Sequence, residues 1–351
     1  MRLTKLQKQL CNALQKGLPV CRRPFAEIAK DLKCDEKTVL QQTGELKNAG
    51  VIRRICALIN YRALGMVSTL AAAHVPQENL QEVAEAVNSL EGVSHNYHRD
   101  HFYNLWFTLQ ARTAAQIDFT LSSLSRRFGI DFHSLPIKRI FKLAVGFDAE
   151  GQDKVLLEGV EVPGVLQKES ETGLEKVPNG EVVGTDGTPK PINQLWEGSD
   201  SDKLILAKLQ DELAITSEPF AFLCGGGLEA KDVLRIITEL IDKGVIRRIA
   251  AGVDHRKLGF VANVLFAAEV PQARIVKAGR RLARSEIVSH CYERETFENW
   301  PYNLFGMMHG RSMGQIQHVI DEFVEAEKID SFQLLPTKAE LKKQPVKHKF
   351  Y

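Results

Sequence analysis

The sequence predicts an α+β protein built from two divergent copies of one module. The first observation is a six-residue string, Gly-Val-Ile-Arg-Arg-Ile, that occurs at residues 50–55 and again at 244–249. The second is that further matches follow in the same order along both copies, ending with Leu-Pro at 135–136 and at 335–336. Because the matches are collinear, the fold must repeat. A chain of 351 residues is long enough to give each copy its own core.

Each copy begins with a helical unit. In the first copy, leucines recur at helical spacing from Leu3 to Leu14, and a second helix begins within residues 25–29. Asp35 can cap a third helix, which ends at Gly50 because glycine favours the conformation that terminates a helix. The order of these helices predicts a helix-turn-helix.

A strand pair that contains residues 51–55 would complete a winged helix-turn-helix. The second copy keeps the pattern, with helices expected at residues 202–213 and 230–244.

The rest of each copy predicts a ferredoxin-like α/β unit. In the first copy the pattern is strand, helix, strand, strand, helix, strand, at residues 67–75, 79–90, 93–100, 103–111, 114–128 and 131–142. A βαββαβ order gives a four-stranded antiparallel sheet with both helices on one face. The other face is free for a ligand or for a second sheet. Because both copies are in one chain, we expect their two sheets to pair as an internal pseudo-dimer.

A polar, Gly- and Pro-rich stretch separates the copies and is typical of a linker. The expected boundaries are a winged helix-turn-helix at 1–60, a ferredoxin-like domain at 61–149, the linker at 150–198, a second winged helix-turn-helix at 199–253, a second ferredoxin-like domain at 254–343, and a tail at 344–351.

Composition limits the possible functions. Lys and Arg number 46 against 44 Asp and Glu, so the net charge of +2 lacks the basic excess of proteins that mainly hold phosphates. The six cysteines form no Cys-x-x-Cys pair, which favours reduced, structural thiols over a zinc site or a disulfide framework. No signal pattern and no apolar run of about 20 residues is present. We therefore expect a cytoplasmic protein without a membrane partner.

Two pairs of strings identify a family. Residues 93–99 read Val-Ser-His-Asn-Tyr-His-Arg and lead to Tyr-Asn-Leu-Trp at 103–106, whereas residues 288–294 read Val-Ser-His-Cys-Tyr-Glu-Arg and lead to Trp-Pro-Tyr-Asn-Leu at 300–304. The domain order resembles the leucine- and asparagine-responsive transcription regulators. The strings resemble those of the siroheme decarboxylases, with the two subunit types fused in one chain.

This resemblance implies a carboxy-lyase that removes carbon dioxide from the C12 and C18 acetates of siroheme. The product, 12,18-didecarboxysiroheme, would serve haem or haem d1 synthesis. The conjugated macrocycle can accept the charge that decarboxylation leaves, so no cofactor is expected beyond the iron of the substrate. Siroheme is the expected partner, and a further homo-oligomer stays open.

The residues of the two strings suggest the chemistry. Alternation along a strand places His95, Tyr97 and Arg99 on one face. The same spacing groups His290, Tyr292 and Arg294. Guanidinium groups suit the carboxylates of the substrate, and a histidine can donate a proton near neutral pH. We expect the histidines and tyrosines to be catalytic, with His290 the leading proton donor and either His290 or His95 a candidate axial ligand of the iron.

Other residues near the strings are candidates for binding the substrate. They are Arg54, Arg248, His98, His101, Tyr103, Asn104, Trp106, Trp300, Tyr302, Asn303 and His309. The alternatives are that the asparagines satisfy turns, that the tryptophans are core residues, and that the arginine pairs are wing residues of a DNA-binding ancestor. The remaining histidines, at positions 74, 133, 255, 318 and 348, are expected to be structural. The longer loop before Pro301 is expected to cover the pocket of the second copy.

A DNA-binding regulator that responds to haem or to an amino acid is the alternative function. Its recognition helix should present cations to DNA, but residues 35–50 offer only Lys37 and Lys47 against Asp35, Glu36 and Glu45. Nucleic acid is therefore not the expected partner. Salt-dependent binding of duplex DNA, set against turnover of siroheme, would separate the two functions.

Overall fold

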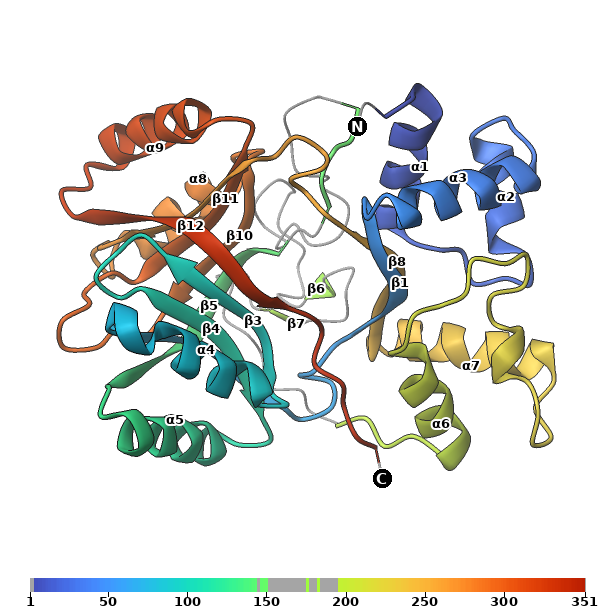
Figure 1. The fold of residues 1–351 in the computed structure, drawn as a ribbon, viewed down its shortest axis with the longest axis horizontal. Helices are drawn as coiled ribbons and strands as arrows, with labels where there is room; N and C mark the ends of the chain where they lie inside the picture. The colour runs from blue at the N-terminus through green and yellow to red at the C-terminus, as the bar shows by residue number, and fades with distance from the viewer. Residues whose placement is uncertain (1–2, 144–145, 151–174, 177–181, 184–194, 351) are drawn as a thin grey trace.

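The protein consists of a β-barrel layer and a helical layer that lie side by side (Figure 1). The computed structural model describes residues 3–143, 146–150, 175–176, 182–183 and 195–350. Most of the expected linker, residues 150–198, lies outside the described residues, apart from the short paired strands β6 (Glu175–Lys176) and β7 (Val182–Val183). Within the described part of the chain, no helix is long and apolar enough to cross a bilayer.

The first helical unit contains α1 (Lys5–Lys16), α2 (Pro24–Asp31) and α3 (Glu36–Asn48). The Asp35 carboxylate accepts a hydrogen bond from the backbone N–H of Thr38 at 2.8 Å, so it caps α3 as expected. Leu10 and Leu14 of α1 are fully buried and belong to the same hydrophobic cluster as buried residues of α2 and α3. This face is the one that the leucine spacing predicted.

The second helical unit is less regular. It keeps α6 (Asp200–Leu209) and α7 (Ala230–Asp242), but only a 3-10 turn, η2 (Ala221–Leu223), stands between them. Three successive glycines at 225–227 follow this turn with positive φ angles, a conformation that glycine adopts without strain. The buried faces of both helical units join one hydrophobic cluster.

The two helical units are held together by a strand pair that differs from the one expected. Strand β1 (Ile52–Ile59) pairs antiparallel with β8 (Ile246–Val253) of the other copy, so the two repeats of the six-residue string lie in one two-stranded sheet. The expectation of a wing within each copy was therefore wrong. Each strand forms its backbone hydrogen bonds with the strand of the other copy, instead of with a neighbouring strand in a local hairpin.

The α/β units follow the predicted order closely. The first contains β2 (Val67–Ala73), η1 (Gln77–Asn79), α4 (Leu80–Ser89), β3 (Val93–Arg99), β4 (Leu105–Ala111), α5 (Ala114–Phe128) and β5 (Phe132–Leu143). The second contains β9 (Ala262–Ala268), α8 (Ile275–Ala283), β10 (Val288–Arg294), β11 (Leu304–Gly310), α9 (Met313–Glu327) and β12 (Phe332–Lys343).

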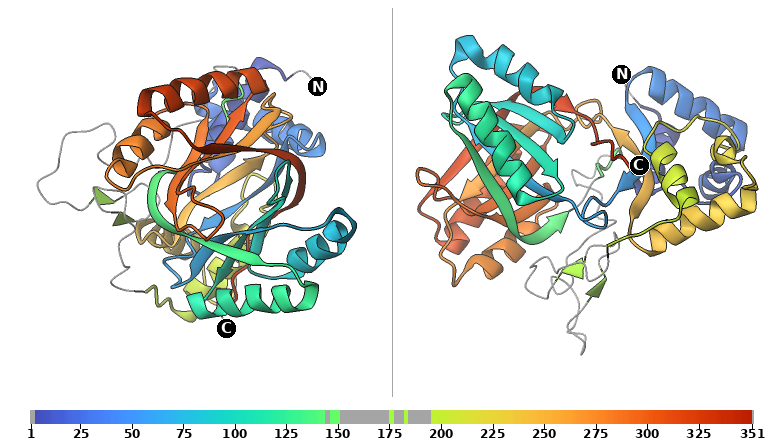
Figure 2. Two further views of the ribbon diagram at one scale, coloured as in Figure 1. Left: turned by 90° about the vertical axis from the view of Figure 1, so that its left-hand side faces the viewer. Right: turned by 90° about the horizontal axis from the view of Figure 1, so that it is seen from below.

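The two sheets join into one closed barrel with the order β10-β11-β9-β12-β3-β4-β2-β5. The long last strand of each copy makes the joint, because β5 pairs with β10 and β12 pairs with β3. Figure 2 shows the ring of strands end-on, with helices of both α/β units outside it. The expected pairing of the copies within the chain is confirmed, and the helix-free faces of both sheets become the inner wall of the barrel.

The barrel has apolar cores on both sides of its wall. Outside it, each pair of helices covers its own half. Inside it, aromatic and aliphatic side chains fill the end that lies away from the helical layer, with Trp106 and Trp300 at 5.2 Å between ring centroids. We call this cluster the aromatic plug; its buried members are Ala72, Tyr103, Trp106, Leu135, Leu265, Ala267, Trp300, Phe305 and Leu335.

The exchanged strand β5 packs tightly against the second copy. Phe141, 2% exposed, lies against Gly279 of α8, where a Cβ atom would overlap its ring. We predict that Gly279→Ala lowers the free energy of unfolding by about 1–3 kcal/mol through overpacking, despite the better helix propensity of alanine. Gly314→Ala on α9 is the control, since the one atom within 4 Å of the added Cβ is the hydroxyl of Ser312, at 3.9 Å. Urea melts in which both variants match the parent would contradict this packing.

Candidate functional site

Two rows of polar side chains face each other inside the barrel, at the end nearest the helical layer. On β3 the rings of His95 and Tyr97 are 6.2 Å apart, and the Arg99 guanidinium lies 5.2 Å from the centre of the Tyr97 ring. On β10 the corresponding values are 6.1 Å for His290 and Tyr292 and 4.9 Å for Arg294 over Tyr292. His95, Tyr97 and Arg99 therefore share one face of β3, and His290, Tyr292 and Arg294 share one face of β10.

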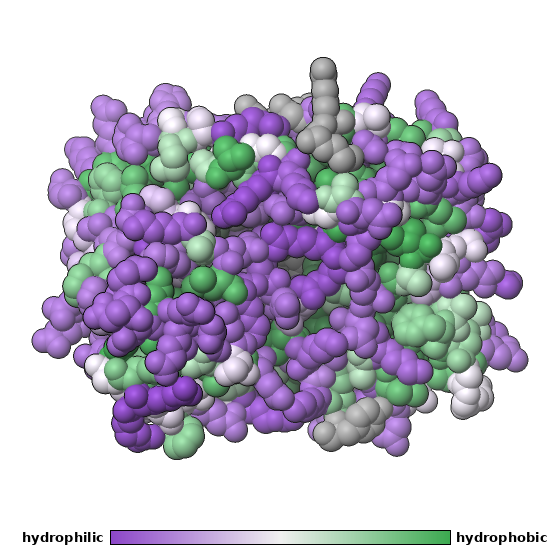
Figure 3. Space-filling model, viewed as in Figure 1, coloured by the Kyte–Doolittle hydropathy of each residue, from purple (hydrophilic) through white to green (hydrophobic). Residues whose placement is uncertain are grey.

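The space in front of these rows is the candidate site, and we call it the chamber. The side chains of His95, Tyr97, His290 and Tyr292 keep a partly accessible surface although protein surrounds them, as expected for the walls of a recess that water can enter. The two rows are close enough for His95 to lower the pKa of His290, after the larger effect of burial. Figure 3 shows a hollow near the middle of this face of the molecule, between the barrel and the helical layer.

Arginines of β1 and β8 approach the chamber from the helical layer. Arg53 and Arg54 both contribute to the lowered pKa of His95, after the larger effect of burial, and Arg247 does the same for His290. Arg53 also forms an ion pair with Glu340 of β12 at 2.7 Å. Arg248 lies on β8, opposite Leu58 of β1. Arg53, Arg54 and Arg247 thus add positive charge to the site from a second layer.

The two halves of the chamber have different backing strands. Arg99, Tyr97 and His95 stand opposite Thr337, Glu340 and Lys343 of β12. Arg294, Tyr292 and His290 stand opposite Ile137, Ile140 and Leu143 of β5 in the same register. One row therefore has polar and charged neighbours, and the other has apolar neighbours.

A chain of hydrogen bonds runs along five neighbouring strands of the barrel wall, from Arg99 on β3 to His290 on β10. Arg99 Nη1 donates to Thr337 Oγ1 at 3.1 Å, and this hydroxyl donates to Asn263 Oδ1 at 3.0 Å. Asn263 Nδ2 lies 3.3 Å from His309 Nδ1. His309 Nε2 lies 3.0 Å from Ser289 Oγ, which is 2.8 Å from His290 Nδ1.

In the first copy the corresponding contacts are local. Ser94 Oγ lies 2.8 Å from His95 Nδ1 and 2.7 Å from Thr108 Oγ1. Thr108 occupies the strand position that Met307 has in the second copy, since each is the partner of the histidine. The histidines are therefore equivalent in sequence but not in their surroundings.

Electrostatics set the charge state of the site. Burial, with help from nearby cations, lowers the pKa of His95 to about 4 and that of His290 to about 3, so both imidazoles are neutral near pH 7. Burial raises the pKa of Tyr97 to about 12, which keeps the phenol protonated. It also lowers the pKa values of Arg99 and Arg294 to about 10, which leaves both guanidinium groups charged.

The two buried arginines have no carboxylate partner among the described residues. Arg99 Nη1 donates to the carbonyl of Leu335 and Arg294 Nη1 to that of Leu135, both at 2.9 Å, while the Nε atoms of both arginines are buried without a partner. A buried charge without a counter-ion destabilises a protein unless a ligand compensates it. The chamber is therefore suited to a ligand that carries several carboxylates.

Several residues expected to bind the substrate lie outside the chamber. Tyr103, Trp106 and Trp300 are at most 7% exposed and belong to the aromatic plug, so the core alternative holds for both tryptophans. Tyr302 packs on Trp300 at 4.8 Å and accepts a hydrogen bond from Gln333. The loop before Pro301 supplies Trp300 to this plug and does not cover the histidines, which corrects that expectation.

Four more of the expected residues have other roles. The Asn104 side chain forms hydrogen bonds with the backbone N–H and carbonyl of Val75, and the Asn303 side chain does the same with Val270, all at 2.8–2.9 Å. Each valine lies two residues after the end of a strand. They satisfy turns, which was the alternative interpretation. His101 accepts a hydrogen bond from the Tyr103 N–H and packs edge-on against Trp300. His98 alternates with its neighbours Tyr97 and Arg99 and so lies on the outer side of β3.

Sequence reasoning missed part of the polar network. His255, expected to be structural, lies 3.4 Å from Asn263 Nδ2 and 3.5 Å from the Lys343 ammonium group. Neither Asn263 nor Lys343 was a candidate, because neither belongs to a motif that the two copies share. A comparison of the two copies at equivalent strand positions would have identified Lys343, because the equivalent residue of the first copy is Leu143.

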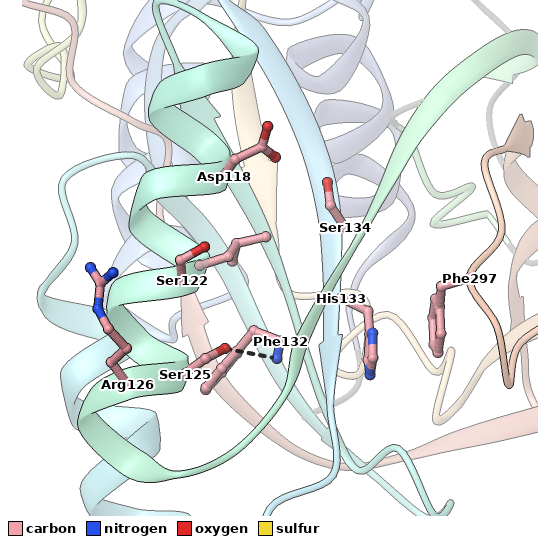
Figure 4. Close-up of a pocket in the computed structure, with 9 residues that line it drawn as sticks. Asp118, Ser122, Ser125, Arg126, Phe132, His133, Ser134 and Phe297 are labelled. Carbon is pink, nitrogen blue, oxygen red and sulfur yellow. Dashed lines mark hydrogen bonds between the residues drawn. The ribbon is translucent and has the colours of Figure 1, made fainter.

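A separate groove of about 580 Å³ lies on the outer surface of the barrel (Figure 4). Helix α5 supplies Asp118 and Arg126 to it, and the His133 ring of β5 stacks on Phe297 of the second copy at 4.0 Å. One arginine beside one aspartate gives no excess positive charge. This groove therefore suits a polycarboxylate less well than the chamber does. Among the described residues, no three His, Cys, Asp or Glu side chains are grouped to hold a metal ion.

Comparisons with known proteins agree with this organisation. Residues 63–142 and 257–342 match the AsnC-like ligand binding domain, and residues 7–53 match the siroheme decarboxylase NirDL-like HTH domain. A siroheme decarboxylase of Hydrogenobacter thermophilus is 30% identical over 97% of this chain and 94% of its own length.

Two further similarities bear on the copies and on the site. The siroheme decarboxylase alpha subunit of Desulfovibrio desulfuricans is 37% identical over 41% of this chain and 84% of its own length, so it corresponds to one copy. The crystal structure of the siroheme decarboxylase NirDL in co-complex with an iron-uroporphyrin III analogue is similar with a TM-score of 0.67 at 26% identity. It covers 98% of this chain and 94% of the other.

The neutral histidines make stability depend on pH. In the unfolded chain a histidine has a pKa near 6.5, but the folded values are about 4 for His95 and about 3 for His290. The unfolded state therefore binds more protons below pH 6.5, and we predict that the free energy of unfolding falls as the pH falls from 7 toward 4. The double variant His95→Gln, His290→Gln should show a smaller fall, measured by urea denaturation at several pH values. His318→Gln, on the exposed face of α9, is the control; equal slopes in all three proteins would contradict the prediction.

Proposed function

The chain belongs to the siroheme decarboxylase family, and on this premise we propose that it removes carbon dioxide from the C12 and C18 acetate side chains of siroheme. The product is then 12,18-didecarboxysiroheme, a precursor for haem or haem d1. The observation that carries the proposal is the pair of buried, charged arginines, Arg99 and Arg294, which have no carboxylate partner among the described residues.

The chamber supports binding of a polycarboxylate. Siroheme carries eight carboxylates, and a guanidinium group binds a carboxylate through two parallel hydrogen bonds. Arg99 and Arg294 lie deep in the chamber, while Arg53, Arg54 and Arg247 act on it from the helical layer. Carboxylates on opposite edges of the macrocycle can then meet positive charge from both layers.

The reaction needs one proton for each carbon dioxide released. The bond between the acetate methylene and its carboxylate breaks, carbon dioxide leaves, and the electron pair stays on the methylene carbon, where the conjugated ring stabilises it. A proton then forms the new C–H bond. Because the substrate supplies the electron sink, the protein has to bind it, keep water away from the reacting carboxylate, and deliver the proton by general acid catalysis.

His95 and His290 are the candidates for delivering the proton and for contacting the iron. Burial lowers the pKa of both histidines and keeps them neutral near pH 7, but carboxylates brought by the substrate favour the charged imidazolium and raise the pKa of a nearby histidine. A proton can then be taken up together with the substrate. Tyr97 and Tyr292, beside the histidines, can donate hydrogen bonds to carboxylate oxygens.

The proposed function is tested by anaerobic incubation of the protein with siroheme, followed by mass analysis of the extracted pigment. Loss of the mass of one and then two carbon dioxide molecules is the expected result. Unchanged siroheme, together with salt-dependent binding of duplex DNA by the same preparation, would replace this function with that of a regulator.

We predict that Arg99→Ala and Arg294→Ala each weaken the binding of siroheme. Removing one partner of a buried ion pair costs about 3–5 kcal/mol, equivalent to a Kd roughly 100-fold higher or more. Titration of the protein followed by visible spectroscopy measures the effect. Arg126→Ala, in the outer groove, removes the same charge elsewhere and should leave the Kd unchanged; unchanged affinity in all three variants would exclude the chamber as the binding site.

We also predict that removing either chamber histidine preserves the fold but affects catalysis. The variant that lacks the proton donor should lose roughly 10²–10⁴-fold in single-turnover rate, which is the usual contribution of a positioned acid. The variant that lacks an iron ligand should instead change the spectrum of the bound pigment. His95→Ala and His290→Ala are compared for rate, spectrum and melting temperature. A full rate with an unchanged spectrum in either variant would remove that histidine from the site.

A further inference from the structure

Lys343, the last residue of β12, brings a positive charge to the side of the chamber on which His95 lies. We infer that its ammonium group binds one carboxylate of the substrate there, and that the His290 side has no equivalent residue. That the carboxylate belongs to siroheme rests on the proposed function. The role of Lys343 itself follows from its place in the barrel, from its few contacts, and from the residue that replaces it in the first copy.

The strand register places the Lys343 side chain inside the barrel. Lys343 stands opposite His95 on β3, so the two side chains lie on the same face of the wall. The preceding residue, Lys342, points the other way and donates to the backbone carbonyls of Asn88 and Leu90, beside α4 on the outside. The Lys343 side chain is 24% exposed, so protein surrounds most of it while a ligand can still touch it.

The charge of Lys343 acts on histidines of both copies. It contributes, after the larger effect of burial, to the lowered pKa of His95 on β3 and to that of His290 on β10. It contributes in the same direction to the lowered pKa values of His255 and His309, where burial is again the largest cause. The ammonium group is therefore close enough to act on both rows of the chamber.

The ammonium group has few contacts of its own. It has three N–H donors, and the one acceptor within hydrogen-bond distance among the described residues is Nδ1 of His255, at 3.5 Å. Burial lowers the pKa of His255 to about 4, so this imidazole is neutral near pH 7 and does not compensate the charge of Lys343. N–H groups of the ammonium are therefore left for water or for a ligand.

Glu340 is the nearby carboxylate, but Arg53 holds it more closely. Glu340 Oε1 lies 2.7 Å from Arg53, whereas Oε2 lies 3.6 Å from Lys343 Nζ, which is longer than a hydrogen bond. Arg53 also lies 3.6 Å from Asp254. These two cations and two carboxylates balance in charge, so Lys343 offers donors and a local charge, while the buried arginines of the two rows supply the positive excess.

The surroundings of Lys343 favour an anionic ligand. Burial is the largest effect on Lys343 and lowers its pKa, against the opposing effect of Glu340. A further carboxylate within about 4–6 Å would stabilise the charged ammonium, because opposite charges favour each other's ionised forms. Such a group would also accept the N–H donors that protein atoms leave unused. Lys343 is therefore suited to bind a carboxylate.

The first copy has no such cation. Leu143 is buried at the equivalent place on β5, opposite His290. Lys142 precedes it, but this lysine stands opposite Cys291, a residue of the outer core, and its ammonium donates to the carbonyl of Ser285 at 2.8 Å. A carboxylate on the His290 side therefore meets no equivalent of Lys343, and the two sides of the chamber bind carboxylates unequally.

The test is a titration with iron uroporphyrin III, an iron porphyrin with eight carboxylates, followed by visible spectroscopy. Lys343→Gln removes the charge and should raise the Kd roughly 10-fold or more, which is the usual contribution of a hydrogen bond to a charged group. Lys343→Arg keeps the charge and should restore most of the affinity. Lys338→Gln is the matched control, because Lys338 lies on the same strand but is 52% exposed and pairs with Asp100 on the surface.

Two results would overturn the role of Lys343. The first is a Kd for Lys343→Gln equal to that of the parent. The second is an equal rise of the Kd in Lys338→Gln, since the effect would then depend on net charge alone. Lys343→Met, which keeps the apolar stem of the side chain, is a second neutral variant, and urea melts establish which of the two is folded under the conditions of the titration.

Binding and decarboxylation are read separately. Iron uroporphyrin III measures binding, whereas mass analysis after incubation with siroheme measures the reaction. A protein that binds the probe through Lys343 but leaves siroheme unchanged would contradict the proposed function alone. A protein that decarboxylates siroheme, but has the same Kd for the probe with and without the Lys343 charge, would contradict the role of Lys343 alone.

Discussion

The exchange of the last strand between the two copies is the constraint on which the rest of the structure depends. Without it, each copy would be an open four-stranded sheet with one apolar face uncovered and an unpaired edge. With β5 on β10 and β12 on β3, the edges are paired and both inner faces are enclosed. The same exchange places each row of histidine, tyrosine and arginine beside a strand that its own copy does not supply.

Enclosure also explains the electrostatics of the chamber. Inside the closed wall, burial keeps both histidines neutral and leaves two guanidinium groups charged without a carboxylate partner among the described residues. A buried charge of this kind costs stability unless an anionic group compensates it. The aromatic plug fills the opposite end of the barrel interior.

The sequence predicted local features well and long-range ones less well. Hydrophobic periodicity located the strands and helices of the α/β units, and alternation placed His95, Tyr97 and Arg99 on one face, because both depend only on neighbours in the chain. The wing was wrong because β1 finds its partner in the other copy, a choice that no local pattern records. Thr337 and Lys343 escaped notice for the same reason, since they reach the chamber only through the exchanged strand.

Covalent linkage of the copies has an evolutionary consequence. In an assembly of identical subunits, every substitution occurs twice, so a chamber on the symmetry axis must stay symmetric. Here a change can occur once: Thr108 in the first copy corresponds to Met307 in the second, and Ile137 corresponds to Thr337. Fusion therefore lets natural selection treat the two walls of one cavity as independent traits, and it guarantees that every molecule contains one wall of each kind.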